Sequence, residues 1–110
     1  MSTLIWSEIA SIEELLNKEN GYIILFKHSP RCIISRIVFS KFKRDYISNK
    51  NILKLIYIDV LKMKKISNQI AQYFSINHES PQVILLKNNK VIYHSSHSSV
   101  SFNTIKNYIL

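Results

Sequence analysis

The stretch YIILFKHSPRCIISRIVF, residues 22–39, decides how this chain folds. It opens with an uninterrupted apolar run over Tyr22–Phe26. A run so short and so rich in aromatic and β-branched residues favours a strand that is buried on both faces. Polar residues at 27–31 then predict a loop. From Cys32 onward apolar residues recur at every fourth position, which predicts an amphipathic helix. These residues are Ile34, Val38, Phe42 and Tyr46.

The residues before this stretch predict one strand and one short helix. An apolar segment over Leu4–Ile9 predicts the strand. Ser11 and Glu14 have the spacing of a capping box, so a helix is expected to begin there. Asn20-Gly21 supplies residue types that favour the left-handed backbone at a helix end. We therefore expect this helix to end just before Tyr22.

The residues after this stretch continue the alternation. Leu53–Asp59 predicts a third strand, and apolar residues at helical spacing between Met63 and Phe74 predict a helix. After a loop over Ser75–Pro81, two short apolar runs flank the polar turn 87–90, as in a β-hairpin. The two runs are Val83–Leu86 and Val91–Tyr93. The last segment, Val100–Leu110, again has helical spacing.

This order of elements defines the expected fold class. Crossover helices join parallel strands and a hairpin joins antiparallel ones, so the chain is predicted to be α/β with a mixed central sheet flanked by helices. It is the element order of the thioredoxin-like fold. The chain has 110 residues and is 46% hydrophobic, enough for one core and too few for two ordinary domains. We therefore expect a single thioredoxin-like domain over residues 1–110.

The net charge of +8 suits nucleic acid, an anionic membrane or an acidic small molecule as partner. The lysines are spread over predicted helices and turns, and basic and aromatic residues are not interleaved. A solvated surface is therefore favoured over nucleic-acid binding. The N-terminus lacks the pattern of a secretory signal, and no apolar stretch is long enough to span a bilayer. We expect a cytoplasmic protein without a membrane partner.

Cys32 is the only cysteine, so an internal disulfide is impossible. It lies at the start of a predicted helix, where unpaired N–H groups and the helix dipole favour a thiolate. Arg31 and Arg36 are expected to add to this effect. The thiolate is the form that attacks a disulfide sulfur, so Cys32 is the candidate catalytic residue. The alternative is a buried, inert cysteine, which the polar loop before it disfavours.

Two further residues are expected to support the thiolate. Ser35 stands where a dithiol oxidoreductase carries the second cysteine of Cys-x-x-Cys. A hydroxyl can hydrogen-bond a thiolate but cannot attack a mixed disulfide, so release requires an external thiol; an ordinary first-turn serine is the alternative. His28 can pair with the thiolate or hydrogen-bond within the loop, and we favour the second role. No histidine shows metal-ligand spacing with Cys32, so we expect no metal.

The second candidate feature is Ser80-Pro81, directly before an apolar strand. Only about 5 to 6% of X-Pro bonds in folded proteins are cis. In thioredoxin folds, however, a cis proline before this strand faces the reactive cysteine and exposes backbone with which a substrate can pair. We therefore expect Pro81 to be cis.

The segments around Cys32 and Pro81 resemble those of the YtxJ-like monothiol bacilliredoxins, a thioredoxin-fold family tied to bacillithiol. The first segment is FKHSPRCIISR, residues 26–36. The second is His78-Glu79-Ser80-Pro81-Gln82-Val83, which is far more specific than Cys-x-x-Ser. Ile66-Ser67-Asn68 and Ser96-His97 flank it in the family's order. One departure is Ile33, where many members carry proline or a small residue.

The resemblance implies a thiol-disulfide oxidoreductase that uses Cys32 to remove bacillithiol, or a similar low-molecular-weight thiol, from protein mixed disulfides. Its partners would be bacillithiolated client proteins and a second low-molecular-weight thiol, with bacillithiol as co-substrate and no tightly bound cofactor. The alternative is a non-catalytic thioredoxin-fold adaptor that binds clients through the Pro81 loop.

The resemblance also suggests which residues meet the substrate. Bacillithiol carries carboxylates, so cationic side chains near the cysteine are suitable contacts, although solvated surface charge is an equal alternative for each. These side chains are Lys27, Arg31 and Arg36. The loop before the strand at Val83 is expected to form the rest of the substrate-facing surface. Its residues are His78, Glu79, Ser80 and Pro81, the first two of which we expect to shape the loop.

Overall fold

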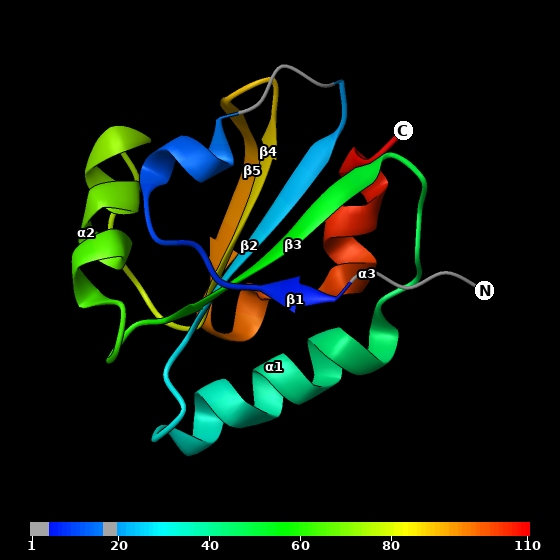
Figure 1. The fold of residues 1–110 in the computed structure, drawn as a ribbon. Helices are drawn as coiled ribbons and strands as arrows, with labels where there is room; N and C mark the ends of the chain where they lie inside the picture. The colour runs from blue at the N-terminus through cyan, green and yellow to red at the C-terminus, as the bar shows by residue number, and fades with distance from the viewer. Residues whose placement is uncertain (1–4, 17–19) are drawn as a thin grey trace.

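The computed structural model describes residues 5–16 and 20–110 (Figure 1). Its sheet has five strands in the order β1-β3-β2-β4-β5. The strands β1, β3 and β2 are parallel to one another, whereas β4 is antiparallel to both β2 and β5. The predicted α/β class with a mixed sheet is confirmed. The strands are β1 (Trp6–Ser7), β2 (Tyr22–His28), β3 (Ile52–Asp59), β4 (Gln82–Lys87) and β5 (Lys90–Ser96).

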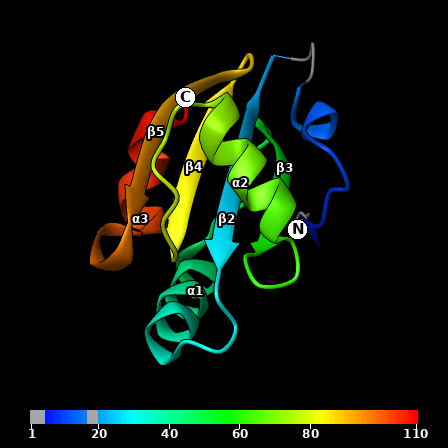
Figure 2. The same cartoon turned by 90° about the vertical axis from the view of Figure 1, so that its left-hand side faces the viewer.

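Helices cover both faces of the sheet (Figures 1 and 2). Helices α1 (Ile33–Asp45) and α3 (Phe102–Ile105) pack on one face, and α2 (Lys64–Tyr73) packs on the other with the 3-10 helix η1 (Ile12–Leu15). Two further 3-10 turns are η2 (His97–Ser99) and η3 (Lys106–Tyr108).

The central strand β2 explains why the run at 22–26 is apolar throughout. Successive side chains of a strand point to opposite faces. Ile24 and Phe26 lie in the core cluster beneath α1, and Ile23 and Leu25 lie in the cluster beneath α2. Both faces of β2 are therefore buried, as predicted.

The strand β2 is longer than predicted, because Lys27 and His28 belong to it. Lys27 pairs with Ile58 of β3 and with Gln82 of β4, and His28 pairs with Asp59. The prediction of a loop at these two residues is wrong. Their polarity suggested a loop, but neighbouring strands and buried polar partners accommodate both side chains.

The first strand is shorter than the predicted Leu4–Ile9 segment, and Leu4 itself lies outside the described residues. A helix does follow Ser11, as the single 3-10 turn η1, and the Glu14 carboxylate accepts the Ser11 N–H at 3.1 Å. The left-handed stop is wrong at Gly21, whose φ is not positive. Glycine is required at 21 for space, because an added Cβ would lie 2.5 Å from Leu53 Cγ.

The remaining elements lie where they were predicted. The strand β3, the helix α2 and the β4–β5 hairpin are confirmed. Asn88 and Asn89, the two hairpin residues, have φ values of 52° and 65°, the positive φ at both positions that a type I′ turn requires. The C-terminal helical segment is split into α3 and η3. Within the described ranges, no helix is both long and apolar enough to cross a membrane.

Candidate active site

Cys32 is exposed and lies at the N-cap of α1. A turn brings it there: its N–H donates to Ser29 O at 3.1 Å, and its carbonyl accepts the Arg36 N–H at 3.0 Å, the first bond of the helix. The alternative of a buried cysteine is therefore wrong, and the reactivity of Cys32 stays a prediction. The thiol reaches solvent at the positive end of a helix of 13 residues.

Ser35 and His28 hold the loop that carries Cys32. Ser35 is fully buried; its Oγ accepts the Ser29 N–H at 3.0 Å and lies 2.8 Å from His28 Nδ1. This network matches the structural role that we favoured for His28. The support that Ser35 and Arg31 were predicted to give the thiolate stays a prediction, since Ser35 Oγ is engaged with the loop.

The His28 ring is packed among aromatic side chains and is held neutral. Phe26, Phe39 and Tyr57 surround it, with ring centroids 4.8 to 6.4 Å away. Burial lowers the pKa of His28, and the charges of Lys43 and Arg36 lower it further, against an opposing effect of Asp59. The ring therefore acts as a neutral hydrogen-bonding group near neutral pH.

The Ser80-Pro81 bond is cis, as predicted. Because β2 and β4 are antiparallel, the end of β2 that leads to Cys32 and the start of β4 that follows Pro81 lie at the same edge of the sheet (Figure 2). Pro81 O accepts the His97 N–H at 2.9 Å. Among the described residues, none hydrogen-bonds the backbone of Ser80, so an extended substrate segment finds unpaired backbone there.

His78 and Glu79 fix this loop to the elements around it. His78 Nδ1 lies 3.1 Å from Ser67 Oγ of α2 and 3.2 Å from Lys27 Nζ of β2. The Glu79 carboxylate pairs with His97 Nε2. The two residues do shape the loop, as predicted; their contact with a substrate stays a proposal.

Lys27 is not the surface cation that we expected. The residue is 0% exposed, and its Nζ donates to Ser67 O at 3.0 Å as well as to His78. Its side chain points to the α2 face of the sheet because it alternates with Phe26 and His28. The prediction of a direct contact with a carboxylate of the substrate is therefore wrong for Lys27.

Arg31 and Arg36 are exposed on either side of Cys32. The sequence contains no acidic residue between 29 and 44, and no described acid forms an ion pair with either arginine. Neither guanidinium group is therefore neutralised by an ion pair with a described acid, although the carboxylate of Asp59 lines a surface hollow together with Arg31. This arrangement is suited to an anionic substrate.

An apolar surface beside the thiol was not predicted from the sequence. Ile33, Ile34 and Ile37 are 68%, 60% and 61% exposed, and we call them the isoleucine face. Ile34 belongs to the predicted apolar repeat that also contains Phe42, but the first turn of α1 presents it to solvent. The available signal was the sequence itself, since three isoleucines at i, i+1 and i+4 after a cysteine lie on one side of a helix.

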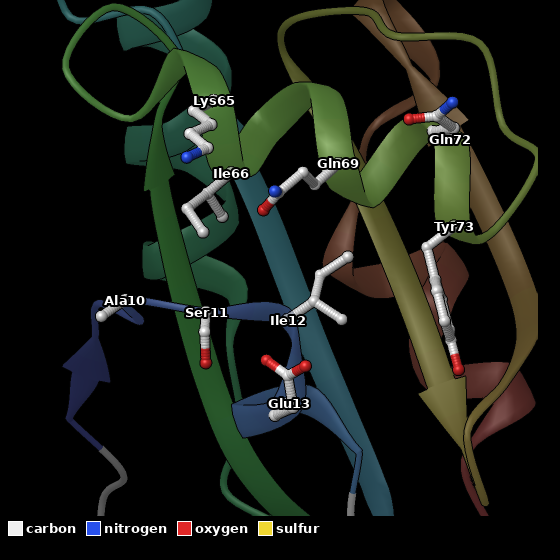
Figure 3. Close-up of a pocket in the computed structure, with 9 residues that line it drawn as sticks. All are labelled: Ala10, Ser11, Ile12, Glu13, Lys65, Ile66, Gln69, Gln72 and Tyr73. Atoms are coloured by element: carbon white, nitrogen blue, oxygen red, sulfur yellow. The ribbon is translucent and has the colours of Figure 1, made fainter.

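One open cavity lies away from Cys32. It has a volume of about 580 Å³ and lies between η1 and α2 (Figure 3). Figure 3 shows Ile12 and Gln69 extending into it, and none of its lining residues belongs to the predicted site. A hollow of about 430 Å³ is lined by the two residues before Cys32, Pro30 and Arg31, together with Asp59, Leu61 and Lys62; Cys32 itself does not line it. We place the site at Cys32 and not at the first cavity, because the thiol supplies the only nucleophile that disulfide exchange can use.

In the part of the chain that the structure describes, no three His, Cys, Asp or Glu side chains converge as metal ligands. The absence of a metal stays a prediction.

Fold and site together define a thioredoxin-fold protein with one exposed cysteine at the start of a helix and a serine in place of a second thiol. The family model of the monothiol bacilliredoxin BrxC matches residues 6–105, so the chain belongs to this family. The predicted resemblance is confirmed, and the activity that follows at the coarse level is thiol-disulfide oxidoreduction.

Solved structures support the fold. A protein described as a candidate oxidoreductase with a thioredoxin fold is 25% identical, with a TM-score of 0.73 over 92% of this chain and 90% of that one. The thioredoxin of Malassezia sympodialis is 14% identical, with a TM-score of 0.68 over 97% and 90% of the two chains. The thioredoxin of Trypanosoma brucei brucei is 10% identical, with a TM-score of 0.68 over 94% and 87%.

Proposed function

We propose that this protein removes bacillithiol, or a similar low-molecular-weight thiol, from protein mixed disulfides through Cys32. The observation that carries the proposal is the position of the thiol: exposed, at a helix N-terminus, on the sheet edge that also carries cis Pro81. Ser35 occupies the place of a second cysteine and cannot resolve a disulfide. Family membership supports the same activity.

The chemistry takes two exchanges. The Cys32 thiolate attacks the bacillithiol sulfur of the mixed disulfide; the new S–S bond forms as the old one breaks, and the client leaves as a thiolate. Cys32 is then bacillithiolated. An external thiolate attacks the bacillithiol sulfur of this adduct, forms a low-molecular-weight disulfide and restores the Cys32 thiolate. No net proton or electron is gained by the protein over the cycle.

The surroundings of Cys32 suit both halves of such a substrate. Arg31 and Arg36 are placed to attract the carboxylates of the thiol. The isoleucine face is an exposed apolar surface. Such a surface is suited to contact with a client protein and not with a small polar thiol. The unpaired backbone of Ser80 suits an extended client segment.

The test is mass spectrometry of the purified protein mixed with a bacillithiolated model protein. We expect the wild type to gain the mass of bacillithiol on Cys32 while the client regains its free thiol. Cys32→Ala, the matched control in a chain with one cysteine, should leave the client modified.

Two outcomes separate the alternatives. Transfer to Cys32 followed by release on addition of free thiol supports the enzyme. If Cys32 takes up no thiol from the client or from small disulfides, and the client still binds, the protein is a thioredoxin-fold adaptor and the proposed activity is wrong.

A further inference from the structure

The buried amine of Lys27 has a contact that the two exchange steps do not use. Its Nζ lies 3.2 Å from Nδ1 of His78, in the loop before Pro81, and donates to Ser67 O at 3.0 Å. A fully buried lysine is costly, because taking a charge out of water is unfavourable. In this protein the ammonium group of Lys27 contacts Nδ1 of His78, a residue that is itself exposed.

This contact selects the tautomer of His78. An ammonium group carries three donors and no acceptor, so Nδ1 must be the unprotonated acceptor whenever Lys27 is charged. The Ser67 hydroxyl, 3.1 Å from the same nitrogen, can donate to it as well. The proton of the neutral ring is then on Nε2.

The Nε2 atom of His78 is the ring nitrogen left for a further partner. His78 is exposed while its Nδ1 is bound to buried partners, and no described residue hydrogen-bonds Nε2. The ring precedes Pro81 by three residues, on the loop at the same sheet edge as Cys32. A donor with a fixed direction is thus presented beside the place where a substrate segment would lie.

We propose that Lys27 is a positioning residue that holds His78 as the Nε2–H tautomer, so that the ring donates a hydrogen bond to an oxygen acceptor of the mixed disulfide lying along the Pro81 loop. The nature of the substrate rests on the proposed function, but the tautomer does not. The acceptor is a carboxylate or carbonyl oxygen, supplied either by the low-molecular-weight thiol or by the client.

The charges around His78 agree with a neutral ring. Burial lowers the pKa of His78 and the charge of Lys27 lowers it further, whereas Glu79 in the same loop raises it. Glu79 is itself paired with His97, and α2 contributes only the uncharged Ser67 at this ring. Protonation of His78 would also place two positive charges in contact, which opposes it.

The tautomer is tested by two-bond 1H–15N correlation spectra of the imidazole rings. At pH 7 we expect one bare nitrogen, Nδ1, and one protonated nitrogen, Nε2, for His78. Lys27→Met should give averaged shifts from a mixture of tautomers, and Lys90→Met, an exposed lysine at the hairpin, should change nothing. A proton on Nδ1 in the wild type, or unchanged shifts in Lys27→Met, overturns the proposal.

The same test can be made without a variant. Burial lowers the pKa of Lys27 to about 8, so raising the pH from 7 to 10 deprotonates it in the wild type. A neutral amine can accept a hydrogen bond, and the Nδ1–H tautomer should then appear. Persistence of the pure Nε2–H form at pH 10 would contradict the role of the lysine charge.

The link to the reaction is tested by a double-mutant cycle. His78→Ala is expected to lower kcat/KM for a bacillithiolated protein about tenfold, the size of one hydrogen bond. Lys27→Met is expected to lower it only about twofold, because a mixture of tautomers still contains the Nε2–H form. Because Lys27 acts through His78, the double variant should lose no more than His78→Ala alone. Additive losses, or an unaffected His78→Ala, would overturn the proposal. A wild type that transfers no thiol would instead overturn the proposed function, and the spectra would still decide the tautomer.

The source of the acceptor is resolved by changing the adduct. The same client carrying cysteamine, which has neither carboxylate nor carbonyl, is compared with the bacillithiol adduct. An effect of His78→Ala on both adducts assigns the acceptor to the client, and an effect on bacillithiol alone assigns it to the thiol. No effect on either contradicts the hydrogen bond.

Discussion

At the scale of single residues, Ser35 does two things that sequence reasoning treated as one. It lacks the chemistry of a resolving thiol, and its hydroxyl connects the Ser29 backbone with the His28 ring. The second role is structural and can be measured apart from thiol transfer. It explains why the position is fully buried although it lies only three residues from an exposed cysteine.

We therefore predict that Ser35→Ala destabilises the fold by about 1 to 3 kcal/mol, the cost of leaving buried polar groups unpaired. Ser29 N–H and His28 Nδ1 would both lose their partner. Urea unfolding measures the change. Ser40→Ala, at an exposed serine of the same helix, is the control and should stay within about 0.5 kcal/mol of the wild type. Equal stability of the two variants would show that the network contributes nothing.

Lys27 gives a second prediction, on pH dependence. Burial lowers its pKa in the folded protein from 10.5 to about 8, so between these values the unfolded chain binds more protons than the folded one. Stability due to this group must then rise as the pH rises through that window. Below about pH 8 the folded protein carries the full cost of the buried charge.

The comparison is urea unfolding of wild type and Lys27→Met at pH 7 and at pH 10. The stability of the variant relative to wild type should fall by on the order of 3 kcal/mol from the lower to the higher pH. All other lysines are shared, so their titration cancels. A difference that is the same at both pH values would mean that Lys27 keeps its ordinary pKa.

At the scale of elements, α1 has two apolar sides with different roles. Phe42 faces the sheet and is buried, whereas the isoleucine face stands beside Cys32 in solvent. Exposed isoleucines contribute little to folding, so their effect should be on binding. They are expected to contact the client rather than the small thiol.

Ile37→Ser should accordingly lower kcat/KM for a bacillithiolated protein by about tenfold, the loss of one buried aliphatic side chain, and leave the exchange with small bacillithiol disulfide unchanged. Ile47→Ser is the matched control, because Ile47 is 64% exposed and lies beyond the other end of α1. Equal losses with the protein and the small disulfide would refute a client contact.

The elements also show where sequence reasoning stops. The apolar run at Tyr22–Phe26 and the Asn88-Asn89 turn encode their structures locally, and both were predicted. Lys27 and Gly21 were predicted wrongly because residues distant in sequence determine their environment. Ser67 O and His78 Nδ1 accept hydrogen bonds from the buried Lys27 amine, and the Leu53 side chain leaves no space for a side chain at position 21. The candidate nucleophile was found from sequence, whereas the contacts between the Pro81 loop and β2 required coordinates.

At the scale of the whole molecule, net charge and its distribution matter more than any single ion pair. The chain carries +8, and the surface beside Cys32 contributes Arg31 and Arg36 without an acidic neighbour between residues 29 and 44. A positive potential raises the local concentration of anions. The Cys32 thiolate should therefore react faster with an anionic electrophile than it would without this potential.

The last prediction compares an anionic with a neutral electrophile. Iodoacetate and iodoacetamide consume the same thiolate, so the ratio of their rates at Cys32 reports the local potential and not the degree of ionisation. We expect the Arg31→Gln, Arg36→Gln double variant to lower this ratio about two- to fivefold, and added salt to lower it in the wild type. Arg44→Gln is the control: at about 1.5 Å per residue it lies about 18 Å along α1 from Cys32, beyond the screening length at physiological salt. If neither added salt nor the loss of the two arginines changes the ratio of the two rates, the positive charge does not act on Cys32. Anionic substrates would then have to be recognised elsewhere.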